Sequence, residues 1–512
     1  MTNKILLHLS IAIIISATGS QAAMLDYLSP ADPTRMMGNI KNESMFSVPV
    51  HKARLTQNDV TNHYNIAMQR FKQANVKSAY MDFAMLIRHI VPNDYAYLRM
   101  ADEMAEIGLF NLSNEALKKV SDKDISYIQA EDIKKFYFPK NSLKKDDEVY
   151  LAEIYSNIMY NAQSKEATAE LIKNTELMGK SDYANYLAAL GSLKAGQTEN
   201  ADKYINEALK TNPDNINYQK LKIEIVMQEN KTKEALKTLE NIKKTKFYTT
   251  DYKDKITSLE LFTLYKTTKD EDLKKYYLAG YYHSIGEGIK ALRTLQSAIS
   301  AKKKFNRQAY ALMAEIYYTQ KEYEKAENFA EKSIQLGGNN PDALMVLGKI
   351  KYRNKDYKTA LKNFKSINTP DNITALVWSA MTYSAMGNEK QAKEIYTKIL
   401  KDKSDCYEAY YNIANNEKER QFEYYKKAVA INIDFIDGWI GLAKNSIEKN
   451  NIQIAGKYLE IVKYIDENDF RYYYYQGLVY KAKGLTKDAN YYFRKSLAIN
   501  PDNKLAKKEL GI

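Results

Sequence analysis

The sequence predicts an all-α fold, an α-solenoid in which pairs of antiparallel helices stack along the chain. Glycine and proline are sparse, at 19 and 9 of 512 residues, and this disfavours turn-rich sandwiches and barrels. Small and large residues recur at fixed offsets roughly every 34 residues, a period typical of helical repeat arrays. Runs such as "EYEKAENFAEKS" place Glu and Lys where they can pair along a solvated helix face.

The charge balance limits the partners that the chain is expected to bind. The 76 Lys and Arg residues exceed the 63 Asp and Glu residues, which gives a formal net charge of +13. Most of the basic residues are Lys, a hydrated point charge that is less suited than Arg to phosphate recognition. We therefore expect no nucleic acid partner. The positive charge still permits an acidic protein, an anionic membrane surface or an anionic glycan.

Residues 1–22 have the pattern of a cleavable signal peptide. Lys4 supplies the positive start, Ile5 to Ala17 form the apolar run, and Ser20 and Ala22 fit the small-residue cleavage site. The run is shorter than the roughly 20 residues of a membrane-spanning helix, and an N-terminal membrane anchor is the alternative interpretation. We expect export to the periplasm, the cell envelope or the exterior, with no transmembrane span after cleavage.

An irregular leader, residues 23–59, precedes the first repeat, because "LSPADPTRMMGNIKNES" is rich in turn formers and lacks helical periodicity. The repeated pattern itself is clearest in "YYYYQGLVYKAKGLTKDANYYFRKSLAINPDN". There Gly477 and Ala489 allow two helices to approach, while Tyr480 and Phe493 fill the gaps between them. Gly484 suits the turn between the helices, and the later Pro ends the second helix. The same offsets predict repeats that begin at residues 60, 94, 182, 216, 272, 307, 341, 373, 407, 436 and 470.

These offsets resemble the tetratricopeptide repeat, in which W-x2-L-G-x2-Y is followed by A-x3-F and then by Pro. The resemblance implies two antiparallel helices in each repeat, the first of which lines a concave groove. It predicts the following organisation of the chain: degenerate repeats over 60–127, an irregular helical segment over 128–181, repeats over 182–249, an extra helical insert over 250–271, repeats over 272–503, and a short cap over 504–512.

The resemblance also implies which side chains line the groove. In this family residues 2, 5, 9, 12 and 13 of the first helix face the groove. Tyrosine occupies the fifth position in five of the predicted repeats, at Tyr64, Tyr186, Tyr276, Tyr411 and Tyr474. It occupies the twelfth position in two others, at Tyr318 and Tyr352. Such an aromatic track can stack on an extended peptide or a sugar chain. The alternative is that Tyr is simply the preferred bulky helix residue of this sequence. The ninth positions carry no repeated Asn or Lys, unlike family members that grip peptide backbones or carboxylates.

Four consecutive tyrosines begin the pattern quoted above, and they cannot share one helix face because neighbouring residues lie about 100° apart. We expect Tyr473, like Tyr480, to be buried between helices, and Tyr472 to point outward. We expect Tyr474 to face the groove and Tyr475 to lie toward the interface between repeats.

Motifs that would indicate catalysis or metal binding are absent from the sequence. The five His residues form no zinc-binding spacing, and Cys406 is the only cysteine. Ser142 and Lys145 spell Ser-x-x-Lys, but the other motifs of that enzyme class are missing. We expect no enzyme, metal or cofactor. The leading hypothesis is an exported scaffold that binds other proteins through the groove, in envelope assembly or secretion; the alternative is a module that binds or exports an envelope polysaccharide.

Overall fold

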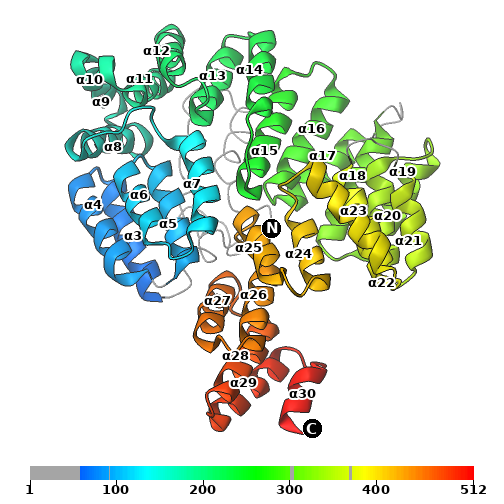
Figure 1. Cartoon of the computed structure of the whole chain (residues 1–512). Coiled ribbons are helices and arrows are strands. Elements are labelled where there is room, and N and C mark those ends of the chain that lie inside the picture. Colours follow the sequence, from blue (N-terminus) through cyan, green and yellow to red (C-terminus); the bar gives the residue numbers. More distant parts are fainter. Residues whose placement is uncertain (1–57, 92, 300–304, 368–371) are drawn as a thin grey trace. The chain divides into compact units, whose positions relative to one another are not determined.

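The computed structural model describes residues 58–91, 93–299, 305–367 and 372–512. Within these ranges the regular structure is helical, without strands (Figure 1). The predicted all-α fold of stacked antiparallel helix pairs is confirmed. The predicted signal peptide and nearly all of the predicted leader lie outside the described residues.

The described chain forms two compact units: residues 58–252 with 425–512, and residues 253–424. The helices of the first unit are, up to residue 252, α3 (Asn58–Lys72), α4 (Val76–Met85), the π-helical turn η3 (Leu86–Ile90), α5 (Asp94–Glu106), α6 (Phe110–Lys119), α7 (Lys123–Tyr137), α8 (Lys145–Tyr160), α9 (Ser164–Lys173), α10 (Thr175–Lys180), α11 (Asp182–Lys194), α12 (Thr198–Thr211), α13 (Ile216–Gln228) and α14 (Thr232–Lys244). After residue 424 the same unit contains most of α25 (Gln421–Ile431), α26 (Ile436–Glu448), α27 (Ile452–Ile465), α28 (Phe470–Ala482), α29 (Thr486–Ile499) and α30 (Lys504–Leu510).

The second unit holds the middle repeats. Its helices are α15 (Thr250–Thr267), which begins in the first unit, α16 (Glu271–Ser284), α17 (Gly288–Ala298), α18 (Asn306–Thr319), α19 (Tyr323–Gln335), α20 (Pro341–Arg353), α21 (Tyr357–Lys365), α22 (Ile373–Ala385), α23 (Glu389–Asp402) and α24 (Tyr407–Asn416). Helices α18 to α23 form three successive helix pairs (Figure 1).

A residue with left-handed backbone closes the turn inside most repeats. It falls on the fifteenth residue counted from the predicted repeat starts, at Ala74, Gly108, Gly196, Asn230, Gly286, Lys321, Lys355, Gly387, Asn450 and Gly484. This conformation lets the chain reverse and satisfies the last carbonyls of the first helix. At Gly484, for example, the next amide, Leu485 N–H, donates to the Tyr480 carbonyl oxygen at 3.0 Å.

Glycine at the eighth repeat position makes room for an aromatic ring from the second helix. A Cβ atom added at Gly348 would overlap the ring of Phe364, and one added at Gly477 would overlap the ring of Phe493. Both rings are buried at 1% exposure. The small and large residues therefore interdigitate as the repeat pattern predicts.

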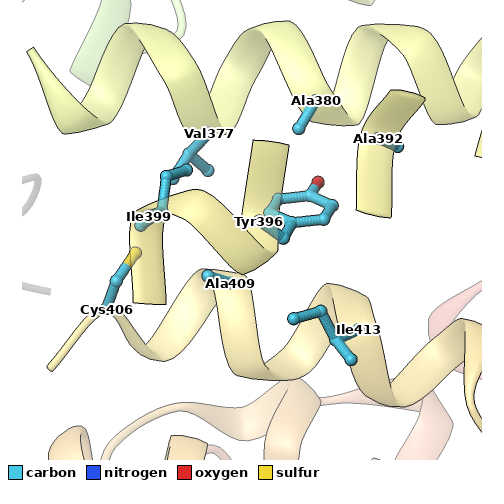
Figure 2. Packing of buried hydrophobic residues seen from close by; sticks show 8 residues of the cluster. All are labelled: Val377, Ala380, Ala392, Tyr396, Ile399, Cys406, Ala409 and Ile413. Carbon is cyan, nitrogen blue, oxygen red and sulfur yellow. The ribbon is translucent and has the colours of Figure 1, made fainter. Parts of the chain in front are cut away.

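Figure 2 shows this packing across three helices of the second unit. The Tyr396 ring of α23 lies between Ala380 of α22 and Ala409 of α24, whose small side chains leave it space. Cys406 lies at the edge of the same cluster and is buried. Burial raises the pKa of its thiol to about 12, so Cys406 behaves as a small apolar residue and not as a reactive thiolate.

The first unit is closed by contacts between segments that are far apart in the sequence. The Arg99 guanidinium of α5 is 1% exposed and lies 2.5 Å from both Asp251 and Asp434. The Tyr95 hydroxyl donates to the second oxygen of Asp434 at 2.7 Å. Burial alone would lower the pKa of Arg99, but the two carboxylates raise it well above its usual value. Arg99 therefore joins the segments at which the chain leaves and re-enters this unit.

Further side chains of α5 and α7 strengthen this closure. Asp132 accepts hydrogen bonds from the Thr249 amide and hydroxyl, both at 2.7 Å. The Tyr252 hydroxyl donates to Asp102. The Lys426 ammonium lies 2.7 Å from Asp124. The repeats before residue 253 and after residue 424 therefore pack as one body.

The expectations for Tyr472, Tyr473 and Tyr480 are wrong. Tyr472 does not point outward; it is 3% exposed, and the Glu460 carboxylate of α27 is among the groups that raise its pKa. Tyr473, expected to be buried, is half-buried, with its hydroxyl donating to the Glu467 carbonyl oxygen at 3.0 Å and its ring stacked 6.3 Å from Tyr492. Tyr480, also expected in the core, is half-buried and stacks 5.0 Å from Tyr492. Tyr472 lies near α27 of the preceding repeat, which sequence offsets alone do not place, whereas Tyr473 and Tyr480 stack on Tyr492 of their own repeat.

Candidate functional site

The candidate site lies on the first helices of the repeats in the second unit. A cavity of about 280 Å³ opens between α18, α20 and the start of α22. Its wall includes Glu315 and Tyr318 from α18, and Asp342, Met345 and Lys349 from α20. These residues occupy the second, fifth, ninth and twelfth places of their repeats, so one helical stripe of each repeat forms the wall.

Tyrosine pairs fix the aromatic part of this surface. Tyr318 packs edge-on against Tyr323 at 5.5 Å, across the turn that joins α18 to α19. In the next repeat Tyr352 packs in the same way against Tyr357, also at 5.5 Å. Each pair spans the turn between the two helices of its repeat. Tyr318 and Tyr352, at the ends of the first helices, therefore have the same kind of aromatic neighbour.

Lys349 connects the two aromatic positions. Its ammonium nitrogen lies 5.5 Å from the centre of the Tyr318 ring and 5.7 Å from that of Trp378 in α22. The Trp378 ring is held edge-on by Tyr352 at 5.4 Å and stacks on Phe364 at 5.8 Å. These distances are typical of cation–π contacts, so the cation and both rings are positioned before any ligand arrives.

Glu315 is the electrostatic centre of the site. Burial lowers the pKa of Lys349 and of His283, and the Glu315 carboxylate opposes both changes. Burial, followed by Glu315, raises the pKa of Asp342. Burial, followed by Asp342 and Glu315, raises the pKa of the Tyr276 hydroxyl to about 12. The site thus presents both signs of charge in a partly desolvated setting, where each charge is stronger than in water.

The seven tyrosines expected to line the groove fall into two groups. Half-buried rings are found at Tyr276, Tyr318, Tyr352 and Tyr411, all in the second unit. Tyr318 lines the cavity, Tyr276 shares the electrostatic environment of Glu315, and Tyr352 holds the ring of Trp378. These side chains keep some surface for a ligand, and their binding role remains a prediction.

The other three tyrosines are in the core, contrary to the expectation of an exposed track. Tyr64 is 3% exposed and donates to Glu103 at 2.7 Å. Tyr186 is 6% exposed and stacks on Tyr218 at 5.0 Å. Tyr474 is 9% exposed and clusters with Phe493 and with Ala506 of α30. In each case a neighbouring helix covers the side that the repeat position would leave open.

Several residues of the site are not predicted by the sequence pattern. Glu315 and Lys349 are ninth-position residues that differ from repeat to repeat and form no repeated clamp, yet both line the cavity and the Glu315 carboxylate raises the pKa of Lys349 against the effect of burial. Asp342 and Met345 occupy second and fifth positions that carry no tyrosine. Trp378 lies at a sixth position, outside the expected stripe, and no sequence signal marks it.

Among the described residues no group of three or more His, Cys, Asp or Glu side chains is arranged to hold a metal ion. None of the helices described above is both long and apolar enough to cross a membrane.

Comparison with known proteins gives matches to repeat proteins. The family model of the tetratricopeptide repeat matches residues 308–339 and 373–401, which cover α19 and α22 and nearly all of α18 and α23. A TPR repeat-containing protein of Methanocaldococcus jannaschii is 25% identical over 393 residues, which are 65% of this chain and 66% of that relative. The chain therefore spans slightly less than two thirds of the relative's length.

Two solved structures are among those similar to this chain. A tetratricopeptide repeat protein from Parabacteroides merdae is 15% identical, with 47% of this chain and 97% of that chain covered and a TM-score of 0.38. The Cut9–Hcn1 structure of the APC/C is 14% identical, with 90% of this chain and 98% of that chain covered and a TM-score of 0.41. At these TM-scores neither structure informs the site of this chain.

Proposed function

Since the chain belongs to the tetratricopeptide repeat family, we propose that it is a scaffold that binds an extended segment of a partner protein at the cavity of the second unit. The observation that carries this proposal is the position of Lys349 between the rings of Tyr318 and Trp378, beside Glu315. Apolar rings, a cation and a carboxylate together can recognise a short peptide segment.

The dimensions of the cavity support a peptide segment over a folded domain. A volume of about 280 Å³ accommodates only a few side chains. Met345 offers an adaptable apolar surface, while Glu315 and Lys349 can each pair with a charge of opposite sign on the ligand. A segment with apolar side chains beside charged ones would satisfy all of these groups.

We propose further that the scaffold acts outside the cytoplasm, in envelope assembly or secretion. This rests on the signal-peptide pattern of residues 1–22. Mass analysis of the protein from fractionated cells should give a mature start near Ala23, and an intact Met1 would contradict export. An anionic envelope glycan remains the second candidate ligand, favoured by the net charge of +13 and by the tyrosine rings.

Site-specific photo-crosslinking tests the peptide proposal. A photoreactive phenylalanine analogue at Tyr318 should crosslink to one short segment of a partner, and a synthetic peptide of that segment should compete. The matched control is the analogue at Tyr127, which is 68% exposed on α7 of the first unit. Lys349→Met should weaken the crosslink from position 318.

Three results would contradict the proposal. One is equal crosslinking of the same partner segment from positions 127 and 318. Another is competition by an acidic polysaccharide but not by the peptide, which would favour the glycan. The third is an undiminished crosslink in the Lys349→Met variant.

A further inference from the structure

A second cavity, in the first unit, lies where the repeat pattern is interrupted. Its volume is about 400 Å³, and it opens between α6, the end of α7, the segment 138–143 and the loop after α12. This region belongs to neither the groove nor the cavity discussed above, and the interaction function proposed for the second unit does not use it.

The segment 138–143 is irregular but firmly held. The Phe138 carbonyl oxygen accepts hydrogen bonds from the Asn212 and Asn215 amides at 3.1 and 3.0 Å. At the other end, the Leu143 carbonyl oxygen accepts one from Asn111 at 3.3 Å. A segment without regular structure that is pinned at both ends by side chains forms a preorganised wall.

Two buried carboxylates hold the same wall from behind. Asp182, 2% exposed, accepts hydrogen bonds from the Lys140 amide and from the Asn212 side chain, both at 2.9 Å. Glu148, fully buried, accepts one from the Asn111 amide at 2.8 Å. Their oxygens thus act as hydrogen-bond acceptors that position the wall.

The side chains on the cavity surface are mainly hydrogen-bond donors. Lys134, Lys135 and Lys140 line it with a single acidic residue, Asp214. Three lysines less one aspartate leave two positive charges. Lys134 also pairs at 3.2 Å with Glu131, which lies outside the lining, in an exposed contact that contributes little. Lys135 is fixed by donating to the Lys246 carbonyl oxygen at 2.6 Å.

Three donors of the lining remain available. Of the residues that the structure describes, none accepts a hydrogen bond from the Lys140 ammonium, the Asn114 amide or the Ser142 hydroxyl. Lys140 and Ser142 come from the pinned segment, and Asn114 comes from α6 on the other side. Beside them, the rings of Phe110 and Phe138 meet edge-on at 5.1 Å and offer an apolar surface.

We propose that this cavity binds a small phosphomonoester. Lys140, Asn114 and Ser142 would donate to the phosphoryl oxygens, and the organic part would lie against Phe110 and Phe138. The reason is charge: a phosphomonoester carries about 1.5 to 2 negative charges at neutral pH, which matches the two excess positive charges of the lining. A monocarboxylate would leave one of them uncompensated.

Isothermal titration of the full chain with O-phosphoserine tests this proposal, with serine as the control ligand. O-phosphoserine should bind with saturation and serine should not. Lys140→Met should weaken binding about tenfold, as expected for the loss of a charge-assisted hydrogen bond. The matched control, Lys119→Met, removes the same charge from an exposed residue at the end of α6 that does not line the cavity. It should leave the affinity within about twofold, since exposed charges at a distance are screened.

A second variant distinguishes a loss of binding from a loss of folding. Asn114→Asp changes few atoms and places a negative charge beside the phosphoryl group, so it should abolish binding while thermal unfolding stays unchanged. Inorganic phosphate is titrated as a further ligand. If it binds more weakly than O-phosphoserine, the result supports an esterified ligand. If it binds more tightly, the proposal of a monoester is wrong and the free ion is favoured. Equal losses in Lys140→Met and Lys119→Met, or equal affinity for succinate and O-phosphoserine, would also overturn the proposal.

Discussion

Arg99 and Asp434 are 335 positions apart in the sequence, yet the guanidinium Nη2 of Arg99 lies 2.5 Å from Oδ2 of Asp434 in the interior of the first unit. Asp251 occupies the other side of the guanidinium. One arginine thus connects α5 to the point where the chain leaves this unit and to the point where it returns. Each buried charge depends on the others for its compensation.

Removing the arginine should therefore strongly destabilise the first unit. Arg99→Leu leaves the buried Asp434 and the partly buried Asp251 without their cation, which costs about 3–5 kcal/mol for a broken buried pair. Urea unfolding can be followed by fluorescence in a Trp378→Phe background, because the remaining tryptophan, Trp439, is buried in this unit. Arg88→Leu, which removes an exposed partner of Glu115, is the control and should change the midpoint little. Equal shifts in the two variants would show that the Arg99 contacts contribute no more than a surface pair.

The close approach at Gly477 predicts a cost of overpacking. Gly477→Ala would push a methyl group into the Phe493 ring and should destabilise the first unit by about 1–3 kcal/mol. Gly456→Ala, inside α27, meets nothing within 4 Å and should instead stabilise by about 0.5–1 kcal/mol. The same Trp439 fluorescence reports both changes. A stabilising Gly477→Ala would contradict the packing of helix α28 on α29.

The left-handed turns predict opposite effects for two substitutions in the second unit. Gly387 has a φ of 79°, and a Cβ atom added there would meet no other atom within 4 Å. Gly387→Ala should therefore lower the free energy of unfolding by about 1–2 kcal/mol through backbone conformation alone. Lys355 holds the equivalent turn with a φ of 64°, and Lys355→Gly should stabilise by up to about 1 kcal/mol. Unfolding followed by Trp378 in a Trp439→Phe background measures both, and changes of the same sign would be inconsistent with this explanation.

Glu148 predicts a pH dependence of stability. Burial raises the pKa of its carboxyl from 4.5 to about 8. Between these values the folded protein keeps a proton that the unfolded chain has lost, so stability should fall as the pH rises from about 4.5 to about 8, with a limiting slope of about 1.4 kcal/mol per pH unit. Glu148→Gln keeps a hydrogen-bond acceptor without the ionisation. Urea midpoints measured across this range should be flatter in the variant, and parallel curves would mean that Glu148 is not the group responsible.

Much of the repeat architecture follows from the sequence because it depends on contacts within a single repeat. Gly348 and Phe364, or Gly477 and Phe493, lie sixteen positions apart on two adjacent helices, and their offset identifies the packing directly. The left-handed residue at the turn is equally local, since the reversal of the chain requires it whether a glycine or Lys355 is present. The site was predicted less well than the fold. Tyr318 lines the cavity as expected, but its charged neighbours follow no repeated sequence pattern from which they could be predicted.

What only the tertiary structure decided are the properties that depend on neighbours in space. Tyr472 is buried on the α27 side and Tyr474 under α30, although their repeat positions predict exposed rings. Arg99 finds partners beyond the reach of any repeat offset, and Lys349 finds Trp378 at a position outside the expected stripe. The sequence by itself determined the helices, their pairing and their turns, because these arise from short-range sterics and periodic burial. The closure of the first unit and the charges of the second arise from helices that meet only when the repeats are stacked, and a repeat pattern holds no information about which individual side chains then meet.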